Sequence, residues 1–442
     1  MKYPFWPDVK GFRDIEFGLE RVLELSKRLG NLHLKLPPVI HVAGTNGKGS
    51  TLAFLQAIFN ENNLKTNKYT SPHLINFNER IILNNKEISD EFLTYCLKEC
   101  RKMANKKPKI DVTFFEGVTI AAFLAFLIEK SDILLLETGM GGILDATNIV
   151  PQILAAIITP ISFDHQDFLG NNIVDIAKNK AGIIKQNCPV ITFQNYQAAF
   201  NIIHNESVAK NSDFYYINDN QVAIDKNILK SNEFNIIDNQ NNWHLQNSDI
   251  NLKFHRPNLI GNFQLINAAL AIIASIKQKE FNISLNSFNK AIIKADWPGR
   301  MQEIQHGKLH NLLSNKSKLF IDGGHNEMAA INIAKFVNSF KSKNKIAIIA
   351  MIKDKDSNAF IKSIASEFDL IICSEIKDKN YILSCSNLKN IGQKYHKNII
   401  EISDIKKALS HIKIKYGNQD NLVMICGSLY LIGDFLEENN VN

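Results

Sequence analysis

The chain has 442 residues, of which 45% are hydrophobic and 21% are charged, as is typical of globular proteins. Its length favours two domains, although one large domain is also compatible with it. The net charge of +7 is spread along the chain without a long block of lysine or arginine, so we expect no nucleic-acid partner. Small anionic substrates remain compatible with this charge.

The cysteines and the first residues bear on the compartment. The six cysteines form no C-x-x-C pair and no dense framework; they are Cys96, Cys100, Cys188, Cys373, Cys385 and Cys426. We therefore expect reduced thiols in a cytoplasmic protein. The start of the chain lacks the pattern of an export signal, and no later stretch approaches eighteen apolar residues, so we expect no membrane span. We also expect a monomer.

Short apolar runs alternate with helix-length segments, which predicts an α/β fold built on parallel sheets. The first series of predicted strands is Val39–Ala43, Ile133–Leu136, Leu154–Ile158 and Val190–Phe193. Between residues 201 and 251 polar residues interrupt every apolar run, and we expect surface loops there. The second series is Leu319–Asp322, Ile346–Met351, Leu370–Cys373 and Leu422–Cys426, with a predicted helix over Met328–Lys341.

The two strand series predict two domains. Pro298 and Gly299 separate a helical pattern from the second series, so we place the join near Ala295 to Arg300. The first predicted domain spans residues 1–295 and contains an N-terminal parallel sheet with a phosphate-binding loop (P-loop). The second, residues 296–442, is a smaller C-terminal α/β domain of Rossmann-like type.

The P-loop candidate is the run GTNGKGS, from Gly44 to Ser50. It follows a predicted strand and precedes a helical pattern, so backbone N–H groups and a helix N-terminus would surround a phosphate, with Lys48 adding charge. The spacing differs from the usual G-x-x-x-x-G-K-[ST], because Val42 replaces the first glycine and Gly49 separates the lysine from the hydroxyl. A glycine-rich helix cap is the simpler alternative, but the full arrangement favours nucleotide binding.

Two residues at predicted strand ends are candidate metal ligands. Glu137 closes the strand Ile133–Leu136 and precedes a glycine-rich loop. His165 follows the strand Leu154–Ile158, so both lie at one edge of a parallel sheet. Mg²⁺ prefers oxygen ligands, which favours Glu137, whereas a single histidine is more often structural.

Several motifs together resemble folylpolyglutamate synthases, including the bifunctional dihydrofolate synthase form, within the Mur ligase superfamily. The resemblance spans nearly the whole chain. The motifs are GTNGKGS from Gly44, YTSPHLINFNERI from Tyr69, ETGMGGILDATNIV from Glu137, SFDHQDFLG from Ser162 and KAGI from Lys180, followed by the segments 261–268, 298–300, 322–326 and 426–431.

The resemblance implies an ATP and Mg²⁺ site. The implied Mg²⁺ ligands are Ser71, Glu137 and His165. The residues implied to wrap the triphosphate are Gly47, Lys48, Gly49 and Ser50. Three further residues are implied to contact the adenine, the phosphates and the ribose, respectively: Asn267, Arg300 and Asp322. The nucleotide would then contact both domains.

Lys180 matches a lysine that this family often carries as a carbamate. A carbamate would turn the cation into an anionic oxygen ligand, with a second Mg²⁺ as its partner. The resemblance therefore places Lys180 with Lys48, Glu137 and His165 among the catalytic residues. The alternative is an ordinary lysine in the basic segment Lys178–Lys185.

The resemblance also implies substrate contacts. The pterin side would involve Thr113, Phe114, Phe115, Glu116 and the loop near Leu144. Core packing is the simpler role for two adjacent phenylalanines. His325 and Ser428 are candidates for the incoming glutamate or for domain closure.

The implied reaction is ATP-dependent joining of L-glutamate to a folate or to dihydropteroate. A carboxylate is unreactive toward amines, so it would first be phosphorylated to an acyl phosphate, with Lys48, Arg300 and Mg²⁺ balancing the charge. The sequence does not decide between dihydropteroate and tetrahydrofolate, or the number of glutamates added.

Three departures from the family pattern and two rival functions remain. Asn179, Phe263 and the segment Gly324–Glu327 differ from the usual residues, and residues 306–318 are interpreted as an inserted hairpin. A cell-wall Mur ligase would need a UDP-binding domain, for which the roughly forty residues before Gly44 are too few. A nucleotide-dependent switch or nucleic-acid motor is the rival of another class.

Overall fold

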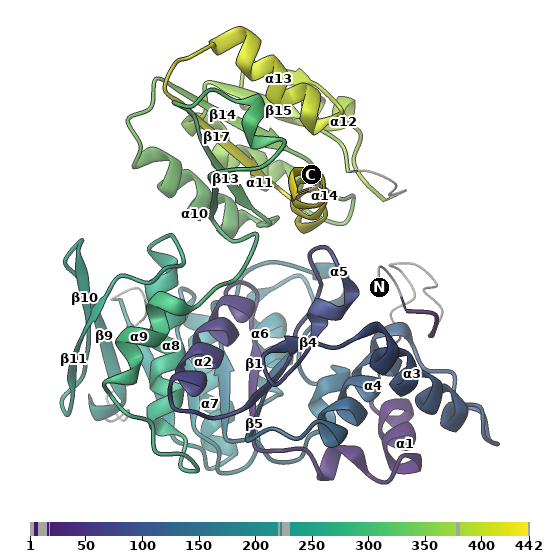
Figure 1. Cartoon of the computed structure of the whole chain (residues 1–442). Helices are drawn as coiled ribbons and strands as arrows, with labels where there is room; N and C mark the ends of the chain where they lie inside the picture. The colour runs from purple at the N-terminus through teal and green to yellow at the C-terminus, as the bar shows by residue number, and fades with distance from the viewer. Residues whose placement is uncertain are drawn as a thin grey trace. The chain divides into compact units, whose positions relative to one another are not determined.

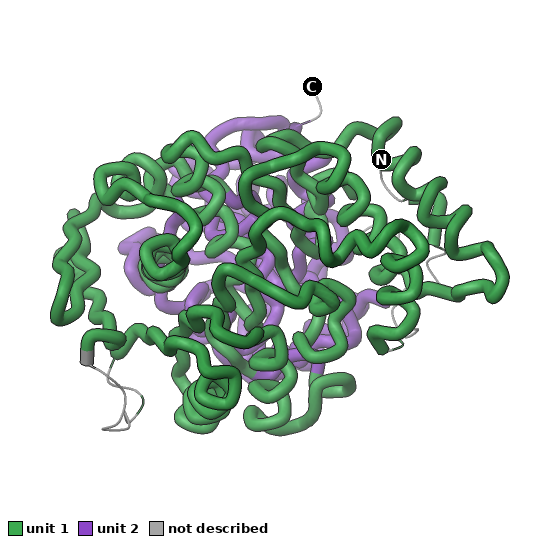
Figure 2. The backbone as a smooth tube through the Cα atoms, turned by 90° about the horizontal axis from the view of Figure 1, so that it is seen from below, with its two compact units in different colours: residues 1–162, 166–258, 264–296 green, residues 163–165, 259–263, 297–442 purple. Residues whose placement is uncertain are grey.

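The computed structural model describes residues 4–7, 16, 18–219, 222, 230–376 and 381–440. The chain divides into two compact units, coloured separately in Figure 2. Unit 1 contains Met1–Ser162, Gln166–Asn258 and Gln264–Asp296, and unit 2 contains Phe163–His165, Leu259–Phe263 and Trp297–Asn442. The main division lies between Asp296 and Trp297. Two short segments earlier in the chain group with unit 2, which a single sequence boundary does not describe.

Unit 1 is built on a sheet that joins eleven of the described strands in the order β11-β10-β9-β8-β7-β6-β1-β5-β2-β3-β4. The central pairs are parallel, whereas β2-β3-β4 and β9-β10-β11 pair antiparallel. Strands β9, β10 and β11 lie together at one end of the unit (Figure 1). The strands are β1 (Val39–Ala43), β2 (Thr66–Tyr69), β3 (Ile81–Leu83), β4 (Lys86–Glu87), β5 (Ile133–Glu137), β6 (Ala155–Ile158), β7 (Val190–Thr192), β8 (Phe214–Asn218), β9 (Glu233–Asp238), β10 (Asn242–Gln246) and β11 (Asn251–His255). The first predicted strand series is confirmed.

Residues 201–251 correct a prediction, because much of this segment is regular structure and not surface loop. It contains the end of helix α7 and strands β8 to β10. Apolar side chains recur at every second position of β10, where Trp243 and Leu245 are fully buried, and Trp243 packs on Phe254 of β11. This alternation buries one face of a short antiparallel sheet while the other face stays polar, so a polar composition does not exclude strands.

Helices cover both faces of the unit 1 sheet. They are α1 (Glu20–Arg28), α2 (Lys48–Glu61), α3 (Asp90–Ala104), α4 (Phe114–Ile128), α5 (Gln166–Leu169), α6 (Ile173–Ala181), α7 (Gln197–Ala209), α8 (Phe263–Lys277) and α9 (Ser287–Lys294). One core cluster packs α1, α3 and α4 on β2 and β5, and a second packs α6 and α7 on β6 and β7.

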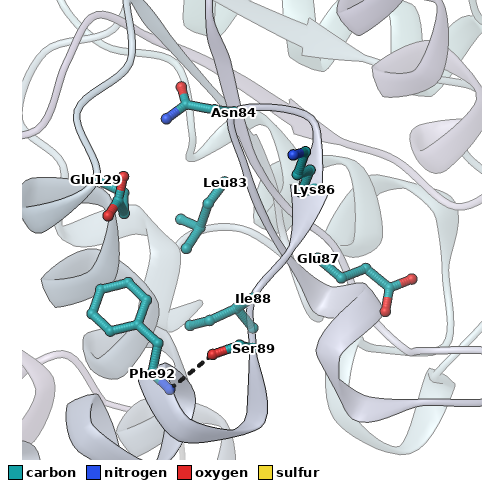
Figure 3. Close-up of a pocket in the computed structure, with 8 residues that line it drawn as sticks. All are labelled: Leu83, Asn84, Lys86, Glu87, Ile88, Ser89, Phe92 and Glu129. Carbon is teal, nitrogen blue, oxygen red and sulfur yellow. Dashed lines mark hydrogen bonds between the residues drawn. The ribbon is translucent and has the colours of Figure 1, made fainter.

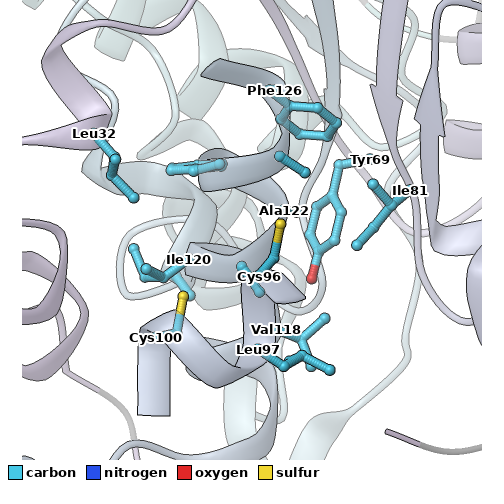
Figure 4. Close-up of a cluster of buried hydrophobic side chains, with 14 of the residues drawn as sticks. Leu32, Tyr69, Ile81, Cys96, Leu97, Cys100, Val118, Ile120, Ala122 and Phe126 are labelled. Atoms are coloured by element: carbon cyan, nitrogen blue, oxygen red, sulfur yellow. The ribbon is translucent and has the colours of Figure 1, made fainter. Parts of the chain in front are cut away.

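Helix α4 shows how the sequence sets these elements. Thr113 caps its first turn, and the apolar run that follows is buried over most of its length. Figure 4 shows Val118 and Ile120 of this helix beside Leu97 and Cys100 of α3. Burying an aliphatic side chain of this size contributes roughly 1.5–3 kcal/mol, so this cluster is a main source of stability for unit 1.

Unit 2 is a smaller α/β unit with the sheet order β12-β13-β17-β14-β15-β16, in which only the β12–β13 pair is antiparallel among the described strands. The strands are β12 (Gln302–Ile304), β13 (Lys318–Asp322), β14 (Asn344–Ile349), β15 (Leu370–Cys373), β16 (Ile399–Glu401) and β17 (Asn421–Cys426). The helices are α10 (Glu327–Asn338), α11 (Ser357–Ile364), α12 (Cys385–Gly392), α13 (Ile405–Tyr416) and α14 (Leu429–Asn440). The second predicted strand series and the predicted α10 are confirmed.

The inserted hairpin predicted over residues 306–318 is wrong. This segment contains one short 3₁₀ helix, η5 (His310–Leu312), and no strand before β13 begins at Lys318. Asn439 of α14 holds it, because its side-chain oxygen accepts the backbone N–H groups of Leu309 and His310. The backbone of this segment is therefore held by the side chain of Asn439 and not by hydrogen bonds between two hairpin strands.

All six cysteines are free thiols and all are buried. Burial raises the pKa of Cys96, Cys373 and Cys385 to about 12, so these thiols stay protonated at neutral pH. Among the residues that the structure describes, no helix has the length and apolarity to cross a membrane.

Candidate active site

The P-loop in unit 1 follows β1 and ends at the first turn of α2. Gly44 and Gly47 both have positive φ, at 145° and 93°. A Cβ atom at Gly47 would lie 2.4 Å from Oδ1 of Asn267, so glycine is required by both conformation and space. The loop thus brings the proposed adenine contact next to the phosphate cradle.

Positive charge gathers at this loop. Nζ of Lys48 donates to the carbonyl oxygens of Gly44 at 3.1 Å and of Thr45 at 3.4 Å. Nζ of Lys180, in the last turn of α6, donates to the same Gly44 oxygen at 2.9 Å. Two ammonium groups at one carbonyl create a strongly positive site, which suits a polyphosphate.

Glu137 is the carboxylate of this site. It ends β5, is 5% exposed, and its Oε1 lies 3.9 Å from Nζ of Lys48. Its Oε2 accepts the backbone N–H of Ser71 at 3.1 Å, so two of the three predicted metal ligands are adjacent. A carboxylate and a hydroxyl are oxygen ligands of the kind that Mg²⁺ takes together with water and phosphate, so these residues fit a divalent cation.

His165, the third predicted metal ligand, belongs to unit 2 in the structure. Within the described residues, no group of three or more His, Cys, Asp or Glu side chains is arranged to hold a metal. Ser71 and Glu137 are in contact within unit 1. The role of His165 as the third ligand stays a prediction.

A buried amide connects two predicted nucleotide ligands of unit 1. Gln264 is fully buried, its Nε2 donates to Oγ of Ser50 at 3.4 Å, and its Oε1 accepts from Nδ2 of Asn267 at 2.8 Å. Because Ser50 accepts this bond, its own proton can point elsewhere, toward a phosphate oxygen. Gln264 was not predicted; its sequence signal is an amide three residues before Asn267, one helical turn away.

The predicted pterin residues lie near the glycine loop that follows Glu137. Phe115 packs over this loop, since a Cβ atom on Gly139 would lie 2.3 Å from its ring. Leu144 on the same loop is 43% exposed. Phe114 instead makes an edge-to-face contact with Phe77 at 5.9 Å. Phe115 and Leu144 are therefore brought to one loop, whereas Phe114 contributes to packing.

Thr113 and Glu116 have structural partners. They form a capping box at the start of α4, in which Glu116 accepts the Thr113 N–H at 2.7 Å. The Glu116 carboxylate also accepts hydrogen bonds from Nε and Nη2 of Arg21, and Glu116 is 4% exposed. Their predicted contact with substrate stays a prediction, and the capping box is sufficient to explain both residue types.

In unit 2, Asp322 ends β13 and holds the turns around it. Its carboxylate accepts the backbone N–H groups of Met301 at 2.8 Å and of Gly324 at 2.6 Å. Burial raises the pKa of Asp322, while the charge of Arg300 and these bonds lower it. The charge of Arg300 thus acts on Asp322, and the contacts of both residues with the nucleotide stay predictions.

Three further polar side chains of unit 2 surround Asp164. Its carboxylate lies 2.5 Å from Nζ of Lys355 and 3.5 Å from Nε2 of His325, and Lys355 also lies 3.3 Å from Nε2 of His165. Burial alone would raise the pKa of Asp164, but His325 and Lys355 lower it well below its usual value. Asp164 and Lys355 were not predicted, because only the fold brings these distant residues together.

Ser428 lies just beyond β17, which neighbours β13. It is 4% exposed and its Oγ accepts the N–H of Tyr430 at 3.2 Å. The backbone of Gly427 donates to the Gly324 carbonyl at 3.1 Å, so the ends of these two strands are joined. Ser428, Asp322 and His325 therefore share the carboxyl edge of the unit 2 sheet, where doubly wound folds bind ligands.

A pocket of about 490 Å³ lies elsewhere in unit 1 (Figure 3). It is lined by Leu83, Asn84, Lys86, Glu87, Ile88, Ser89, Phe92 and Glu129, from β3, β4 and the ends of α3 and α4. None of the predicted site residues lines it.

Two protein-family models match the chain. Residues 42–275 match the model of the Mur ligase middle domain, and residues 302–438 match that of the C-terminal domain of dihydrofolate synthetase. The structure is also similar to "E.coli FolC in complex with DHPP and ADP", with a TM-score of 0.83 and 26% identity over 97% of this chain and 94% of that one. The molecule is a two-unit ligase of the Mur type.

The relatives narrow this class. A dihydrofolate synthase/folylpolyglutamate synthase of Bacillus subtilis is 32% identical over 433 residues, which cover 94% of each chain. A bifunctional folylpolyglutamate synthase/dihydrofolate synthase solved with Mn, AMPPNP and L-glutamate has a TM-score of 0.80 and 26% identity, covering 96% of this chain and 94% of that one. The chain belongs to the dihydrofolate synthase/folylpolyglutamate synthase family.

Proposed function

We propose that this ligase uses ATP and Mg²⁺ to join L-glutamate to dihydropteroate, to a reduced folate, or to both. The observation that carries the proposal is the convergence of Lys48, Lys180, Glu137 and Ser71 at the carboxyl edge of the unit 1 sheet. This edge combines positive charge for a polyphosphate with oxygen ligands for a cation. The ligands named in similar structures, ADP, AMPPNP, Mn, DHPP and L-glutamate, support the same substrate set.

The reaction proceeds through an acyl phosphate. A carboxylate oxygen of the pterin substrate attacks the γ-phosphorus of ATP, and ADP leaves. The glutamate nitrogen then attacks the acyl carbon, the C–N bond forms, and phosphate departs with the former carboxylate oxygen while the amine loses a proton. Lys48 and Arg300 balance the charge on the transferring phosphoryl group, and the backbone of the P-loop holds the triphosphate.

Glu137 and Ser71 would hold Mg²⁺, with His165 as the third proposed ligand. The cation supplies neutralising charge at the β- and γ-phosphates when bound. For the nucleotide we keep Gly47, Gly49, Ser50, Asn267 and Asp322 as proposed contacts. Phe115 and Leu144 are proposed for the pterin, and His325 and Ser428 for glutamate.

A carbamate on Lys180 with a second Mg²⁺ is the finer proposal. Its support is the position of Nζ, which is buried at the P-loop carbonyl of Gly44 close to Lys48. A lysine forms a carbamate when its neutral amine adds CO₂ and releases a proton. The carbamate would bring anionic oxygens to this place.

The test of the proposed function follows oxygen atoms. Dihydropteroate labelled with ¹⁸O in its carboxylate is incubated with ATP, Mg²⁺ and L-glutamate, and the released phosphate is analysed by mass spectrometry. We expect one ¹⁸O atom in each phosphate and no ADP formation without the pterin. Without glutamate we expect no sustained ADP formation, because the acyl phosphate then has no acceptor. Unlabelled phosphate would exclude the acyl phosphate, and ATP turnover that needs nucleic acid instead would favour the motor alternative.

We propose further that the chain acts as a monomer in the cytoplasm without a nucleic-acid partner. The dilute charge of +7 supports the absence of a nucleic-acid partner, and the six free, buried thiols support a reducing compartment. Light scattering on the purified protein should give the mass of one 50.0 kDa chain.

A further inference from the structure

A histidine lies in the middle of β1, a strand of unit 1 that is buried at every residue. His41 lies in β1 between β5 and β6, opposite Leu136 and Ala156, and has no exposed surface. Among the residues that the structure describes, its Nδ1 has no hydrogen-bond partner. An unpaired polar atom in a core costs more than an apolar side chain of similar size, so packing alone does not explain a histidine here.

The other ring nitrogen of His41 begins a chain of hydrogen bonds. Nε2 lies 2.9 Å from Oγ1 of Thr147, in the 3₁₀ helix η3 (Ala146–Ile149), and Thr147 is fully buried. Oγ1 of Thr147 in turn donates to Oδ1 of Asp145 at 2.5 Å. The chain therefore runs from the central strand to a carboxylate in the glycine loop.

The number of protons fixes the direction of this chain. Burial raises the pKa of the Asp145 carboxyl, while the hydrogen bonds from Thr147 and from the backbone N–H of Met140 lower it. The hydroxyl of Thr147 has one proton, and it donates this proton to Oδ1 of Asp145. His41 must then donate from Nε2, as a neutral ring with a bare Nδ1. Burial lowers the pKa of His41 to about 3, which agrees with a neutral ring. The unpaired Nδ1 thus follows from the role of Nε2.

Asp145 connects this hydrogen-bond chain to the backbone of the glycine loop. Its Oδ2 accepts the N–H of Met140 at 2.8 Å, and its Oδ1 accepts the N–H of Thr147 at 3.0 Å. The carboxylate therefore ties the start of the glycine loop to its end. This loop follows Glu137 directly, and Phe115 packs on its Gly139.

We propose that His41 and Thr147 are positioning residues, which hold the Asp145 carboxylate and thereby fix the loop of residues 139–144 beside Glu137 and Phe115. Neither residue touches a reactant. The effect on catalysis rests on the proposed pterin site, whereas the effect on the loop does not.

Two substitutions interrupt the chain at different places. Thr147→Val keeps the shape of the side chain and removes the hydroxyl, and His41→Leu removes the donor. Thr147→Ser and His41→Gln keep a hydroxyl and a donor, so they should rescue. Thr66→Val is the matched control. Thr66 is also a fully buried threonine, and its hydroxyl donates to Oδ1 of Asn85 at 2.8 Å. It is the first residue of β2 and so lies at the amino edge of the sheet, whereas the glycine loop follows the carboxyl end of β5.

The first measurement is hydrogen–deuterium exchange on the full chain. We expect the peptide that covers residues 138–147 to exchange about tenfold faster in Thr147→Val and His41→Leu, since a bond to a charged group is lost. The rescue variants and Thr66→Val should match the wild type there, with α7 as the internal reference. Unchanged exchange of this peptide in both disrupting variants would overturn the proposal, and either variant suffices if the other does not fold.

The second measurement separates positioning from stability. We expect the KM for dihydropteroate to rise about tenfold in Thr147→Val, with the KM for ATP unchanged and wild-type values in Thr147→Ser. A purely structural role would lower the melting temperature and the active fraction, as in Thr66→Val, and leave both KM values unchanged. Faster loop exchange with an unchanged pterin KM would support the loop-holding role and remove the glycine loop from the proposed pterin site.

Discussion

The carboxyl edges of the two sheets are equipped differently. In unit 1 the edge is formed by a glycine-rich backbone and two lysines, Lys48 and Lys180, which share one carbonyl acceptor. In unit 2 the edge presents Asp322, whose oxygens are occupied by the backbone N–H groups of its own turns. The first edge suits a highly charged anion, and the second suits groups that donate hydrogen bonds, such as a ribose hydroxyl or an amine.

The two units also differ in how their buried charges are compensated. Unit 1 brings two lysines to one carbonyl oxygen, and the Glu137 carboxylate lies 3.9 Å from Lys48, so a bound polyphosphate would add to the negative charge at this place. Unit 2 places Asp164 between Lys355 and His325, so its charges are compensated within the protein. Substitutions should therefore affect chemistry most strongly in unit 1.

The largest effect is expected for Lys48→Ala. We expect kcat to fall about a thousandfold or more, because the variant loses the ammonium that balances the negative charge of the transferring phosphoryl group. The melting temperature should change little. Lys102→Ala, which removes an exposed lysine of α3, is the control and should keep full activity. Wild-type kcat in folded Lys48→Ala would remove the P-loop assignment.

Lys180 offers a sharper test of the basic edge. We expect Lys180→Ala to lose roughly a hundredfold in kcat, and a short carboxylic acid in the buffer to restore part of it by placing an anion in the vacated space. Lys180→Arg should stay inactive, because guanidinium does not take up CO₂. Lys178→Ala, an exposed neighbour on α6, is the control. Near-normal activity of Lys180→Arg would contradict the carbamate and leave the ligase assignment standing.

Glu137 and His165 test whether the metal depends on both units. We expect the half-saturating Mg²⁺ concentration to rise about tenfold in Glu137→Gln and in His165→Ala, because each loses a proposed ligand. Glu91→Gln, at an exposed site on α3, is the control. A shifted titration for Glu137→Gln with a wild-type curve for His165→Ala would assign the metal to unit 1 alone.

The smallest effect is expected for Gly47→Ala. Both Gly47 and Gly417 have positive φ, at 93° and 54°, but a Cβ at Gly417 meets no atom within 4 Å. Each alanine should cost about 1–2 kcal/mol of stability through backbone strain. Only Gly47→Ala should also raise the KM for ATP, by roughly fivefold, since its Cβ meets Asn267. Equal KM values for ATP in both variants would contradict the proposed contact between Asn267 and the nucleotide.

The sequence predicted those parts of the fold that depend on local pattern. Continuous apolar runs identified β1 and β5 because central parallel strands are buried on both faces. The antiparallel β10 was missed, since only alternate residues are apolar there. Likewise, the turn after β12 depends on Asn439, more than a hundred residues away.

The candidate site follows the same division. Lys48 and Glu137 stand at strand ends within recognisable motifs, so their neighbourhood could be predicted. Gln264 and Lys355 act through partners that only the fold supplies, at 3.4 Å to Ser50 and 2.5 Å to Asp164. Thr113 and Glu116 show the converse, because residues that match a ligand motif also serve as a helix cap.

The buried cysteines can serve as natural probes of the unfolding of each unit. Cys96 and Cys100 lie in the core cluster of α1, α3 and α4 in unit 1, whereas Cys373 and Cys426 lie in the core of unit 2. A thiol reagent can reach each group only when the surrounding core opens, and only the thiolate reacts. Labelling rates followed by mass spectrometry would therefore time the unfolding of each unit separately, without any engineered probe.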